Sequence, residues 1–467
     1  MNIQFLGATG GEVTGSKVLV TTITGKKILL DCGTYQGKGL ETDSMNRDLG
    51  FNPEEIDILL LSHAHIDHSG LIPYICKQGF KGKIYCTHAT RDLCSIMLPD
   101  AGKIQESDII DFNKKQAKLG LPPGEPLYTA RDAFASLRYF ISMPTDLKIT
   151  IEEGVQVAFY GTGHILGGSA IVLYFQENGE EKSLCYTGDI GRYNKHLLKN
   201  PDPFPQVDYI ITESTYGDRR HEPIPKAEEK LAQVVQETCV KNLGKLLIPS
   251  FAIGRCQEII YILNLLKKKN RLPDVPIFVD SPLSVSATDI YRLHTECFKD
   301  DILDVIRTQK DPFGFDNLIY VRTKEDSKRL NTHNRPCIII SASGMMEAGR
   351  IKHHLANNIE NRRTTVLVVG YCSPNTLGHK IASGEKIVSI YGNKYQVNAQ
   401  IRQIDALSGH ADYEEMHRYL SCQDKNKVKQ IFLIHGERPV QYKYRDYLNT
   451  NGFKNISIPE FRENVIL

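Results

Sequence analysis

Short apolar runs that each end in polar residues recur along the first two hundred residues of the chain. Runs at 56–61, 155–159 and 209–212 have the length and composition of buried β-strands. Runs at 16–22 and 27–31 predict a hairpin. Open α/β sheets usually carry their chemistry where buried strands end. The pattern therefore predicts a sheet sandwich whose functional side chains gather along one edge.

A different pattern begins near residue 214, where amphipathic helical segments alternate with short apolar runs. Helical spacing at 226–242 and 257–269 encloses an apolar run at 245–249, and further runs follow at 276–279 and 337–340. Strands that alternate with helices indicate a parallel sheet covered by helices. This segment is therefore expected to be a second domain, different in kind from the first.

The first pattern returns near the C-terminal end of the chain. The run 429–434 leads directly into His435, as the run 56–61 leads into a histidine-rich stretch. We therefore predict that the α/β segment is an insertion. The predicted domain bounds are 1–210 and 396–467 for the two parts of one domain, and 211–395 for the insert.

The stretch Ser62-His63-Ala64-His65-Ile66-Asp67-His68 brings three imidazoles and one carboxylate into six residues. His63 and His65 alternate, so an extended backbone points both to one side, and Asp67 and His68 then turn past them. A zinc ion takes about four ligands, and a catalytic zinc keeps one position for water. Ligands in two directions indicate two metals, whereas the alternative is a hydrated surface loop or satisfied histidines.

Other strand ends carry single polar residues of the same chemical kinds. Each one alone is more typical of a structural role, but as a series they indicate one set of ligands along a sheet edge. Asp31, at the end of the run 27–31, is either a turn residue or an acceptor that orients the histidine stretch. The remaining residues in this series are His164, Asp189, Glu213, His410 and His435.

Composition narrows the class of protein without identifying it. The 57 basic and 55 acidic residues give a net charge of +2, so no global field attracts nucleic acid, although a local basic groove stays open. The 11 cysteines show no framework spacing, which favours reduced thiols in a cytoplasmic protein. We do not expect the first residues to form a signal peptide, because no basic region precedes an apolar core. No apolar run reaches the ~18 residues that a membrane helix needs, so no membrane partner is expected.

Taken together, these motifs resemble the metallo-β-lactamase superfamily and, within it, the β-CASP ribonucleases. The resemblance spans essentially the whole chain, and it implies an α/β fold: an αββα metallo-β-lactamase sandwich with an inserted parallel β-CASP domain. It also implies two Zn²⁺ ions per chain. The implied ligands are His63, His65 and His164 for the first zinc; Asp67, His68 and His435 for the second; and Asp189 as the bridge.

The resemblance further implies how an RNA phosphodiester is cut. Two zinc ions supply an acidified water and offset developing charge. His410 is the expected general acid, because an imidazole pKa of about 6.5 suits proton delivery. Glu213 is expected to accept from the other ring nitrogen of His410, and Asp67 is counted both as a ligand and as a catalytic residue.

The inserted domain is expected to hold the RNA by its phosphates. Ser343 and Gly344 are predicted to open a helix, where free N–H groups suit phosphate oxygens. Arg255 is expected in the first turn of another helix. Met345 continues the first of these motifs, and His379 stands where relatives commonly carry a basic residue.

These residues are compatible with four functions. The favoured one is a zinc-dependent ribonuclease acting on single-stranded RNA in processing or decay, by endonucleolytic or 5′–3′ exonucleolytic cleavage. A DNA-directed β-CASP nuclease is an alternative, but those branches usually carry valine where this chain has His435. A non-catalytic RNA-binding scaffold is another, although no metal ligand is missing. A small-molecule lactonase or thioesterase leaves the insertion unexplained. The oligomeric state, including a homodimer, stays open.

Overall fold

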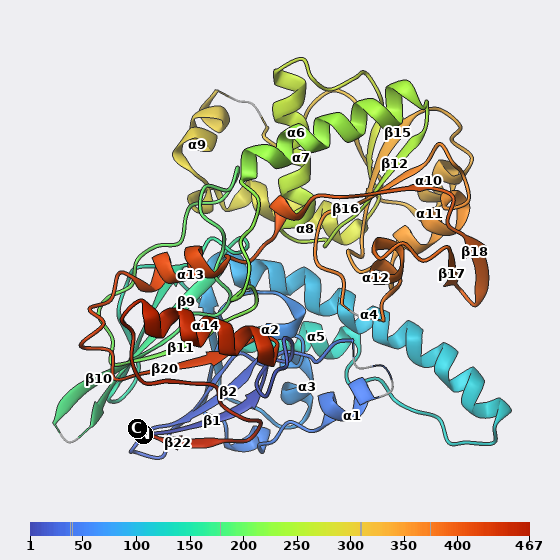
Figure 1. Ribbon diagram of the computed structural model, residues 1–467. Coiled ribbons are helices and arrows are strands. Elements are labelled where there is room, and N and C mark those ends of the chain that lie inside the picture. The colour runs from blue at the N-terminus through green and yellow to red at the C-terminus, as the bar shows by residue number, and fades with distance from the viewer. Residues whose placement is uncertain (38, 40, 178, 309–310, 374) are drawn as a thin grey trace. The chain divides into compact units, whose positions relative to one another are not determined.

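The computed structural model describes residues 1–467 apart from 38, 40, 178, 309–310 and 374 (Figure 1). The chain divides into two compact units. The first unit contains Met1–Tyr193, Asn200–Arg220 and His410–Leu467. The second unit contains Asn194–Lys199 and His221–Gly409.

The first unit is built on two sheets. One has the order β22-β1-β2-β3-β4-β5-β6 and the other β21-β20-β11-β10-β9-β8-β7. The strands of the first sheet are β22 (Asn464–Ile466), β1 (Asn2–Gly7), β2 (Lys17–Thr21), β3 (Lys27–Leu30), β4 (Ile58–Leu60), β5 (Lys83–Thr87) and β6 (Phe140–Met143). The strands of the second are β21 (Ile456–Ser457), β20 (Gln430–Ile434), β11 (Tyr209–Glu213), β10 (Glu180–Tyr186), β9 (Ser169–Glu177), β8 (Val155–Gly161) and β7 (Ile149–Glu152).

The two sheets bury their facing sides against each other. Every second residue of β1 and β8, including Phe5 and Phe159, enters one apolar core together with Phe432 of β20. The opposite face of the second sheet packs on helices through another core, to which Met416 and Tyr444 contribute. Figure 1 shows α13 and α14 over this face. The helices of this unit are α1 (Glu41–Arg47), α2 (Ile66–Ser69), α3 (Ile72–Lys77), α4 (His88–Lys118), α5 (Ala130–Ser136), α13 (Tyr413–Leu420) and α14 (Arg438–Thr450). The predicted αββα sandwich is confirmed.

One strand pair joins the distant parts of the first unit. β11 and β20 are parallel neighbours, with Glu213 opposite Ile434. β10 lies parallel to β11 on its other side. The C-terminal ends of these three strands therefore share one edge of the sheet, and the residues that follow them are brought together.

The second unit holds a parallel sheet in the order β14-β13-β15-β12-β16-β19. Its strands are β14 (Leu318–Tyr320), β13 (Ile277–Val279), β15 (Cys337–Ser341), β12 (Lys245–Pro249), β16 (Thr365–Val368) and β19 (Gln400–Gln403), with a separate hairpin of β17 (Ile387–Ile390) and β18 (Asn393–Gln396). Its helices are α6 (Ile224–Val235), α7 (Arg255–Lys268), α8 (Pro282–Leu293), α9 (Asp300–Arg307), α10 (Lys324–Asn331), α11 (Arg350–Asn358) and α12 (Leu377–Ala382). Parallel strands covered by helices agree with the expected inserted α/β domain.

The compact units do not end where the sequence pattern placed the domain bounds. The return to the first unit occurs at His410, whereas the predicted bound was residue 396. The difference arises because β19 pairs with β16 and so completes the second unit's sheet. At the entry, the short segment Asn194–Lys199 also belongs to the second unit, where Lys199 N donates to Cys297 O over 3.1 Å.

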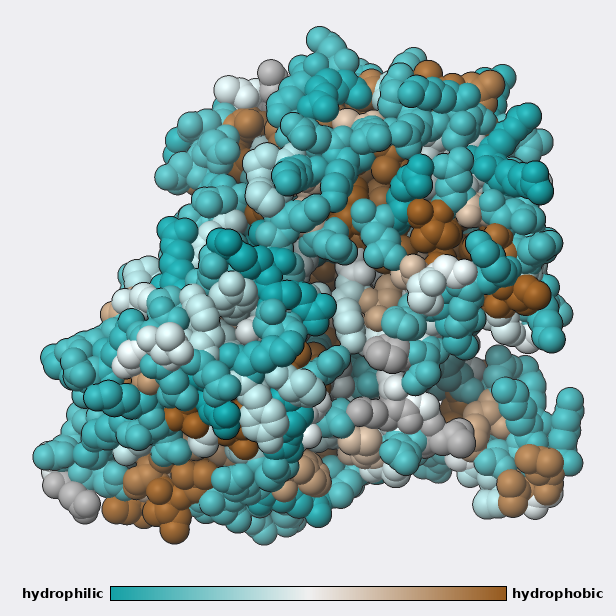
Figure 2. All heavy atoms as spheres, viewed as in Figure 1, coloured by the Kyte–Doolittle hydropathy of each residue, from teal (hydrophilic) through white to brown (hydrophobic). Residues whose placement is uncertain are grey.

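Hydrophilic side chains dominate the face of the molecule that Figure 2 shows. All eleven cysteines are free thiols, most of them buried. Within the described residues, none of the helices is both long and apolar enough to cross a bilayer.

One charged side chain lies fully inside the first unit. Lys17, the first residue of β2, is 0% exposed. Its Nζ donates to Gly33 O over 3.3 Å and lies 4.4 Å from the centre of the Tyr35 ring. Burial lowers the pKa of Lys17 from 10.5 to about 8, because desolvation of the ammonium outweighs the opposing charges of Cys32 and Asp48.

We predict that Lys17→Met stabilises the protein at pH 7 by about 1–3 kcal/mol. At ~1.4 kcal/mol per pKa unit, the charged lysine costs the folded protein roughly 3 kcal/mol, and loss of the bond to Gly33 O offsets part of the gain. Between pH 8 and 10.5 the unfolded chain binds more protons at this lysine than the folded chain does, so the parent's free energy of unfolding should rise with pH in this window. The variant should lose that rise. Denaturant unfolding at several pH values measures both effects, and the exposed Lys83→Met is the control. A variant that keeps the parent's pH slope would contradict the prediction.

Candidate metal centre and catalytic site

The histidine stretch, which follows β4, is held to the end of β3 by the carboxylate of Asp31. Ser62 donates from its N–H to Asp31 Oδ1 and from its hydroxyl to Asp31 Oδ2, each over 2.7 Å. Beyond this point His65 precedes the short helix α2, which contains Asp67 and His68. Gly33 packs against the same turn, and a Cβ at Gly33 would lie 1.6 Å from Asp67 O. A larger residue there would displace the turn.

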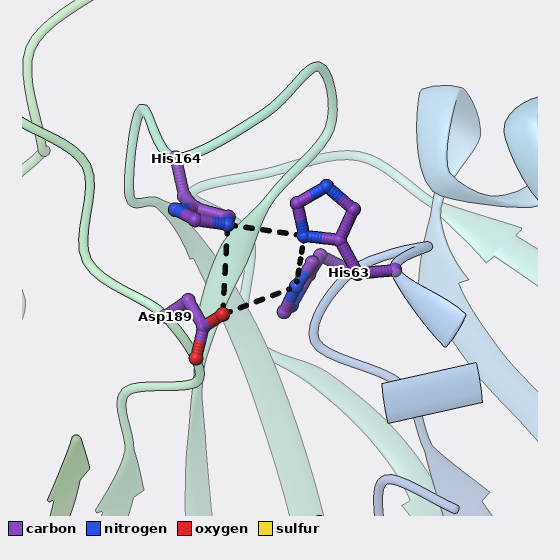
Figure 3. Close-up of side chains that lie close together, drawn as sticks. His63, His164 and Asp189 are labelled. Atoms are coloured by element: carbon purple, nitrogen blue, oxygen red, sulfur yellow. Dashed lines mark hydrogen bonds and ion pairs between the residues drawn. The ribbon is translucent and has the colours of Figure 1, made fainter. Parts of the chain in front are cut away.

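Three imidazoles and one carboxylate oxygen form the first group of potential ligands. His65 Nδ1 lies 3.2 Å from His63 Nε2 and 3.1 Å from His164 Nε2. Both Nε2 atoms lie 3.5 Å from Asp189 Oδ2. Figure 3 shows His63, His164 and Asp189 pointing at a common centre from three separate segments.

A second group lies beside the first. His68 Nε2 is 3.4 Å from His435 Nε2, which is 3.6 Å from Asp67 Oδ2. Asp189 Oδ1 lies 3.3 Å from His68 Nε2 and 3.8 Å from His435 Nε2. Asp189 thus turns one oxygen toward each group. The structure brings together all seven residues that the sequence predicted as ligands.

The chemistry of these donors fits divalent metal ions. Asp189 Oδ1 is buried and accepts no hydrogen bond from the described residues. Several ring nitrogens lie so close together that the lone pairs of neutral imidazoles would repel one another. A bound cation or added protons would remove this repulsion. Imidazole and carboxylate together are a donor set suited to zinc.

The pKa values of the first group favour neutral imidazole, the form that binds metal. Burial is the largest cause, and it lowers the pKa of His63 and of His164 far below the ordinary value. The same desolvation lowers the pKa of His65 to about 4, although the charges of Asp67 and Asp189 oppose it. These rings are therefore ready to donate lone pairs at neutral pH.

The ring of His63 is oriented through its other nitrogen. The Ser62 hydroxyl gives its proton to Asp31, so its oxygen accepts from His63 Nδ1 at 3.0 Å. This places the proton on Nδ1 and leaves Nε2 for a metal, in the usual way that hydrogen bonds fix a ligand's tautomer.

Asp31 also holds His68, whose Nδ1 donates to Asp31 Oδ2 over 2.6 Å. Tyr186 donates to the same oxygen over 2.8 Å. Burial disfavours imidazolium, but the carboxylates of Asp189 and Asp31 outweigh it and raise the pKa of His68 well above the ordinary value. Of the two readings of Asp31, the contacts match an acceptor that orients the histidine stretch.

The pair of His410 and Glu213 lies next to the metal groups. His410 Nδ1 is 3.1 Å from Glu213 Oε2 and 3.8 Å from Asp189 Oδ2. Glu213 Oε1 is itself fixed by the Ile190 N–H at 2.5 Å. Burial opposes the charged ring, yet the charges of Glu213 and Asp189 raise the pKa of His410 to about 9. His410 is therefore protonated on both ring nitrogens at neutral pH in the metal-free protein.

The residues predicted to bind phosphate all lie in the second unit, near the C-terminal ends of its strands. Ser343, Gly344 and Met345 follow β15, and Gly378 of α12 donates to Met345 O over 3.0 Å. His379 is exposed in α12. Arg255 begins α7 as predicted, but it is buried and paired with Glu258 Oε2 at 2.6 Å.

The prediction that Ser343 and Gly344 open a helix is wrong. The segment after β15 is a turn closed by Ser343 N donating to Ala348 O over 3.3 Å, and α11 begins only at Arg350. A short polar segment between a strand and a helix does not reveal, from residue types alone, whether it forms the first helical turn or a closed loop.

Three orienting residues, Ser62, Tyr186 and Thr215, were not assigned a role from sequence. Tyr186 and Thr215 contact Asp31 and His435 respectively, each through a hydroxyl group. Both stand at or just beyond the end of a strand that carries a ligand or its partner. Position next to a ligand-bearing strand end was the available signal, but hydroxyl residues are common there.

The fold and these clustered donors define a metallo-hydrolase with an inserted α/β domain. In chain order, residues 10–220 match the Metallo-beta-lactamase superfamily, 256–381 the Beta-Casp domain, and 394–459 the Zn-dependent metallo-hydrolase RNA specificity domain. The chain belongs to the β-CASP branch of the metallo-β-lactamase superfamily. It is a metal-dependent nuclease.

Three relatives show how far the similarity extends. Ribonuclease TTHA0252 of Thermus thermophilus is 32% identical over 455 residues, covering 97% of this chain and 97% of that protein. The RNase J-like protein of Methanocaldococcus jannaschii is 32% identical over 457 residues, covering 96% and 95%. Cleavage and polyadenylation specificity factor 73 of Drosophila melanogaster is 30% identical over 442 residues, covering 94% of this chain and 60% of that protein.

Proposed function

We propose that the protein is a zinc-dependent ribonuclease that hydrolyses single-stranded RNA with two metal ions. The observation that carries the proposal is the position of Asp189, whose two oxygens face two separate groups of ligand atoms. The RNA specificity domain match and the relatives named as ribonuclease and RNase J-like protein support RNA as the substrate.

One zinc would be held by His63, His65 and His164. The other zinc would be held by Asp67, His68 and His435. Asp189 would be a ligand of both. Two zinc ions bound there supply an acidified water and offset charge on the phosphate during displacement. The protein contributes ligand side chains that are already in position before substrate binds. Asp67 is a catalytic residue in this scheme because it is a ligand at the partly exposed side of the site, where it is 21% exposed.

His410 would deliver the proton that the leaving oxygen needs. Its Nδ1 lies 3.1 Å from Glu213 Oε2, and its Nε2 would deliver the proton. With a 22% exposed side chain, His410 is also accessible. Protonation of the leaving 3′ oxygen gives one product with a 3′-hydroxyl and the other with a 5′-phosphate.

The second unit would position the RNA strand. Ser343, Gly344 and Met345 expose part of a turn, and His379 stands on the neighbouring helix α12. Phosphate contacts of this kind place a strand without reading its sequence. Arg255 contributes less free charge than its residue type suggests, because Glu258 already balances it.

We predict that purified protein contains about two zinc ions per chain and that His435→Ala contains about one. The variant removes a ligand of the second group only, so the first group keeps its full set of nitrogens. Elemental analysis of protein prepared without chelators measures the content. His88→Ala, which removes an exposed histidine elsewhere in the first unit, is the matched control and should keep both ions. A parent protein with one ion or none argues against the two-metal site.

We predict that the protein cleaves single-stranded RNA and that DNA of the same sequence is a poor substrate. End-labelled RNA should give products with 5′-phosphate and 3′-hydroxyl ends, and a chelator should stop the reaction. Mapping both product ends distinguishes internal cutting from progressive removal of nucleotides. Equal or faster cleavage of the matched DNA would overturn the substrate assignment.

We predict that His410→Ala loses about 10²–10⁴-fold in the rate of cleavage, the usual contribution of one general acid. It should keep both zinc ions and its RNA affinity, since His410 is assigned to neither metal. Substrates with a better leaving group should be spared much of the loss. The measurements are single-turnover rates, metal content and RNA binding, with His88→Ala again as control. A variant that loses zinc would make His410 a ligand instead.

A further inference from the structure

Thr215 is brought beside His435 by the register of the sheet. Because β11 and β20 are parallel with Glu213 opposite Ile434, the residues after Glu213 run alongside those after Ile434. Ser214 N donates to His435 O over 3.3 Å, which continues the pairing by one step. Thr215 then lies against the histidine itself.

The Thr215 hydroxyl makes two contacts with that one residue. It donates to His435 O over 3.1 Å, and its oxygen lies 3.0 Å from His435 Nδ1. A hydroxyl carries a single proton. With that proton given to the carbonyl, the oxygen acts as acceptor toward the ring, and this arrangement favours a hydrogen on Nδ1. The lone pair of neutral His435 is then on Nε2.

Nε2 is the atom of His435 that faces the second group. It is the nitrogen 3.4 Å from His68 Nε2, 3.6 Å from Asp67 Oδ2 and 3.8 Å from Asp189 Oδ1. The opposite tautomer would place a hydrogen in this space and no lone pair. Selection of the tautomer is therefore selection of the metal-binding form of the ring.

The backbone of His435 is fixed by neighbouring residues, so the contact with Thr215 is made from a defined position. His435 has a φ of 52°, in the left-handed region that is uncommon for residues other than glycine. Its N–H is fixed by Ala8 O at 2.7 Å. Gly436 follows, and a Cβ at that position would lie 2.5 Å from Ser214 Oγ. The backbone conformation is thus set by its neighbours, and Thr215 links it to the ring.

We propose that Thr215 is the positioning residue that selects the Nδ1–H tautomer of His435 and thereby sets the affinity of the second metal. The inference rests on the proposed two-metal function. It differs from that function by predicting a site-selective effect: loss of the hydroxyl weakens one metal and leaves the other unchanged, because His63, His65 and His164 have no contact with Thr215 among those described.

Two pairs of variants isolate the hydroxyl. The parent and Thr215→Val have side chains of the same shape, with and without the hydroxyl. Thr215→Ser and Thr215→Ala differ by the hydroxyl alone and give the same comparison if valine prevents folding. The control is Thr212→Val, which removes a buried hydroxyl of β11 whose contacts are Thr187 Oγ1 and Glu213 O. Thermal unfolding verifies that each variant is folded.

The first measurement is titration of the metal-free proteins with Zn²⁺ against a competing chromophoric chelator. The Kd of the zinc held by the second group, which His435→Ala identifies, should rise about 10–100-fold in Thr215→Val and in Thr215→Ala, the usual effect of losing a ligand's hydrogen-bond partner. The Kd of the other zinc should not change. Thr215→Ser should restore the raised Kd to within a few-fold of the parent's, and Thr212→Val should match the parent.

The second measurement needs neither metal nor activity. Ring nitrogens of ¹⁵N-histidine-labelled, metal-free protein report the tautomer by their chemical shifts, and His435→Ala identifies the signals of His435. Above the pH at which the His435 ring becomes neutral, the parent and Thr215→Ser should show Nδ1–H, whereas Thr215→Val should show a mixture of tautomers or the Nε2–H form.

Each outcome decides the matter. Unchanged zinc affinity in both hydroxyl-free variants overturns the inference, and so does a Thr215→Ser variant as weak as Thr215→Ala, which would mean that the methyl group acts by packing. A parent that binds no second zinc overturns it together with the two-metal site. A parent that binds two zinc ions and cleaves no RNA removes the proposed function and leaves the role of Thr215 standing.

Discussion

The buried carboxylate of Asp189 lies at the centre of the first unit's polar interior. A carboxylate 3% exposed is stable only if positive charge or hydrogen-bond donors surround it. Here it has imidazoles on both sides, and although burial opposes ionisation, the rings of His435 and His68 hold the pKa of Asp189 well below its ordinary value. The same carboxylate keeps the two ligand groups apart by presenting one oxygen to each. The histidines that offset the negative charge of Asp189 are therefore the same residues that are positioned to bind metal.

Imidazoles bind metal only through a nitrogen that carries a lone pair, and hydrogen bonds orient three of the five ligand rings accordingly. His63 is oriented by a serine, His68 by a carboxylate and His435 by a threonine, each at Nδ1. The partners come from different strands, so the tautomers depend on sheet register as much as on residue type. Asp31 serves two of these rings at once, which ties the histidine stretch to the end of β3.

The insertion lies between two neighbouring strands of the same sheet. The chain leaves the first unit after β11 and returns before β20, and these two strands are direct neighbours. Because parallel neighbours need a long crossover, a whole domain can be placed between them without breaking the sheet. The second unit also has parallel strands, and the segments predicted to hold phosphate follow the C-terminal ends of those strands.

Sequence alone determined the residue types, the strand ends on which they stand and the existence of an insertion. These features are local: apolar runs predict buried strands, and a polar residue after such a run is readable without knowing its neighbours. The sequence did not determine the end of the insertion, because β19 is too short and polar to show which sheet it joins. It placed Ser343 and Gly344 in a helix that begins only at Arg350. It also could not show that Tyr186 contacts Asp31 or that Thr215 contacts the ring of His435. The last of these facts depends on which strands lie side by side, because Tyr186 and Asp31, and Thr215 and His435, are more than a hundred positions apart and meet only when the whole chain has folded.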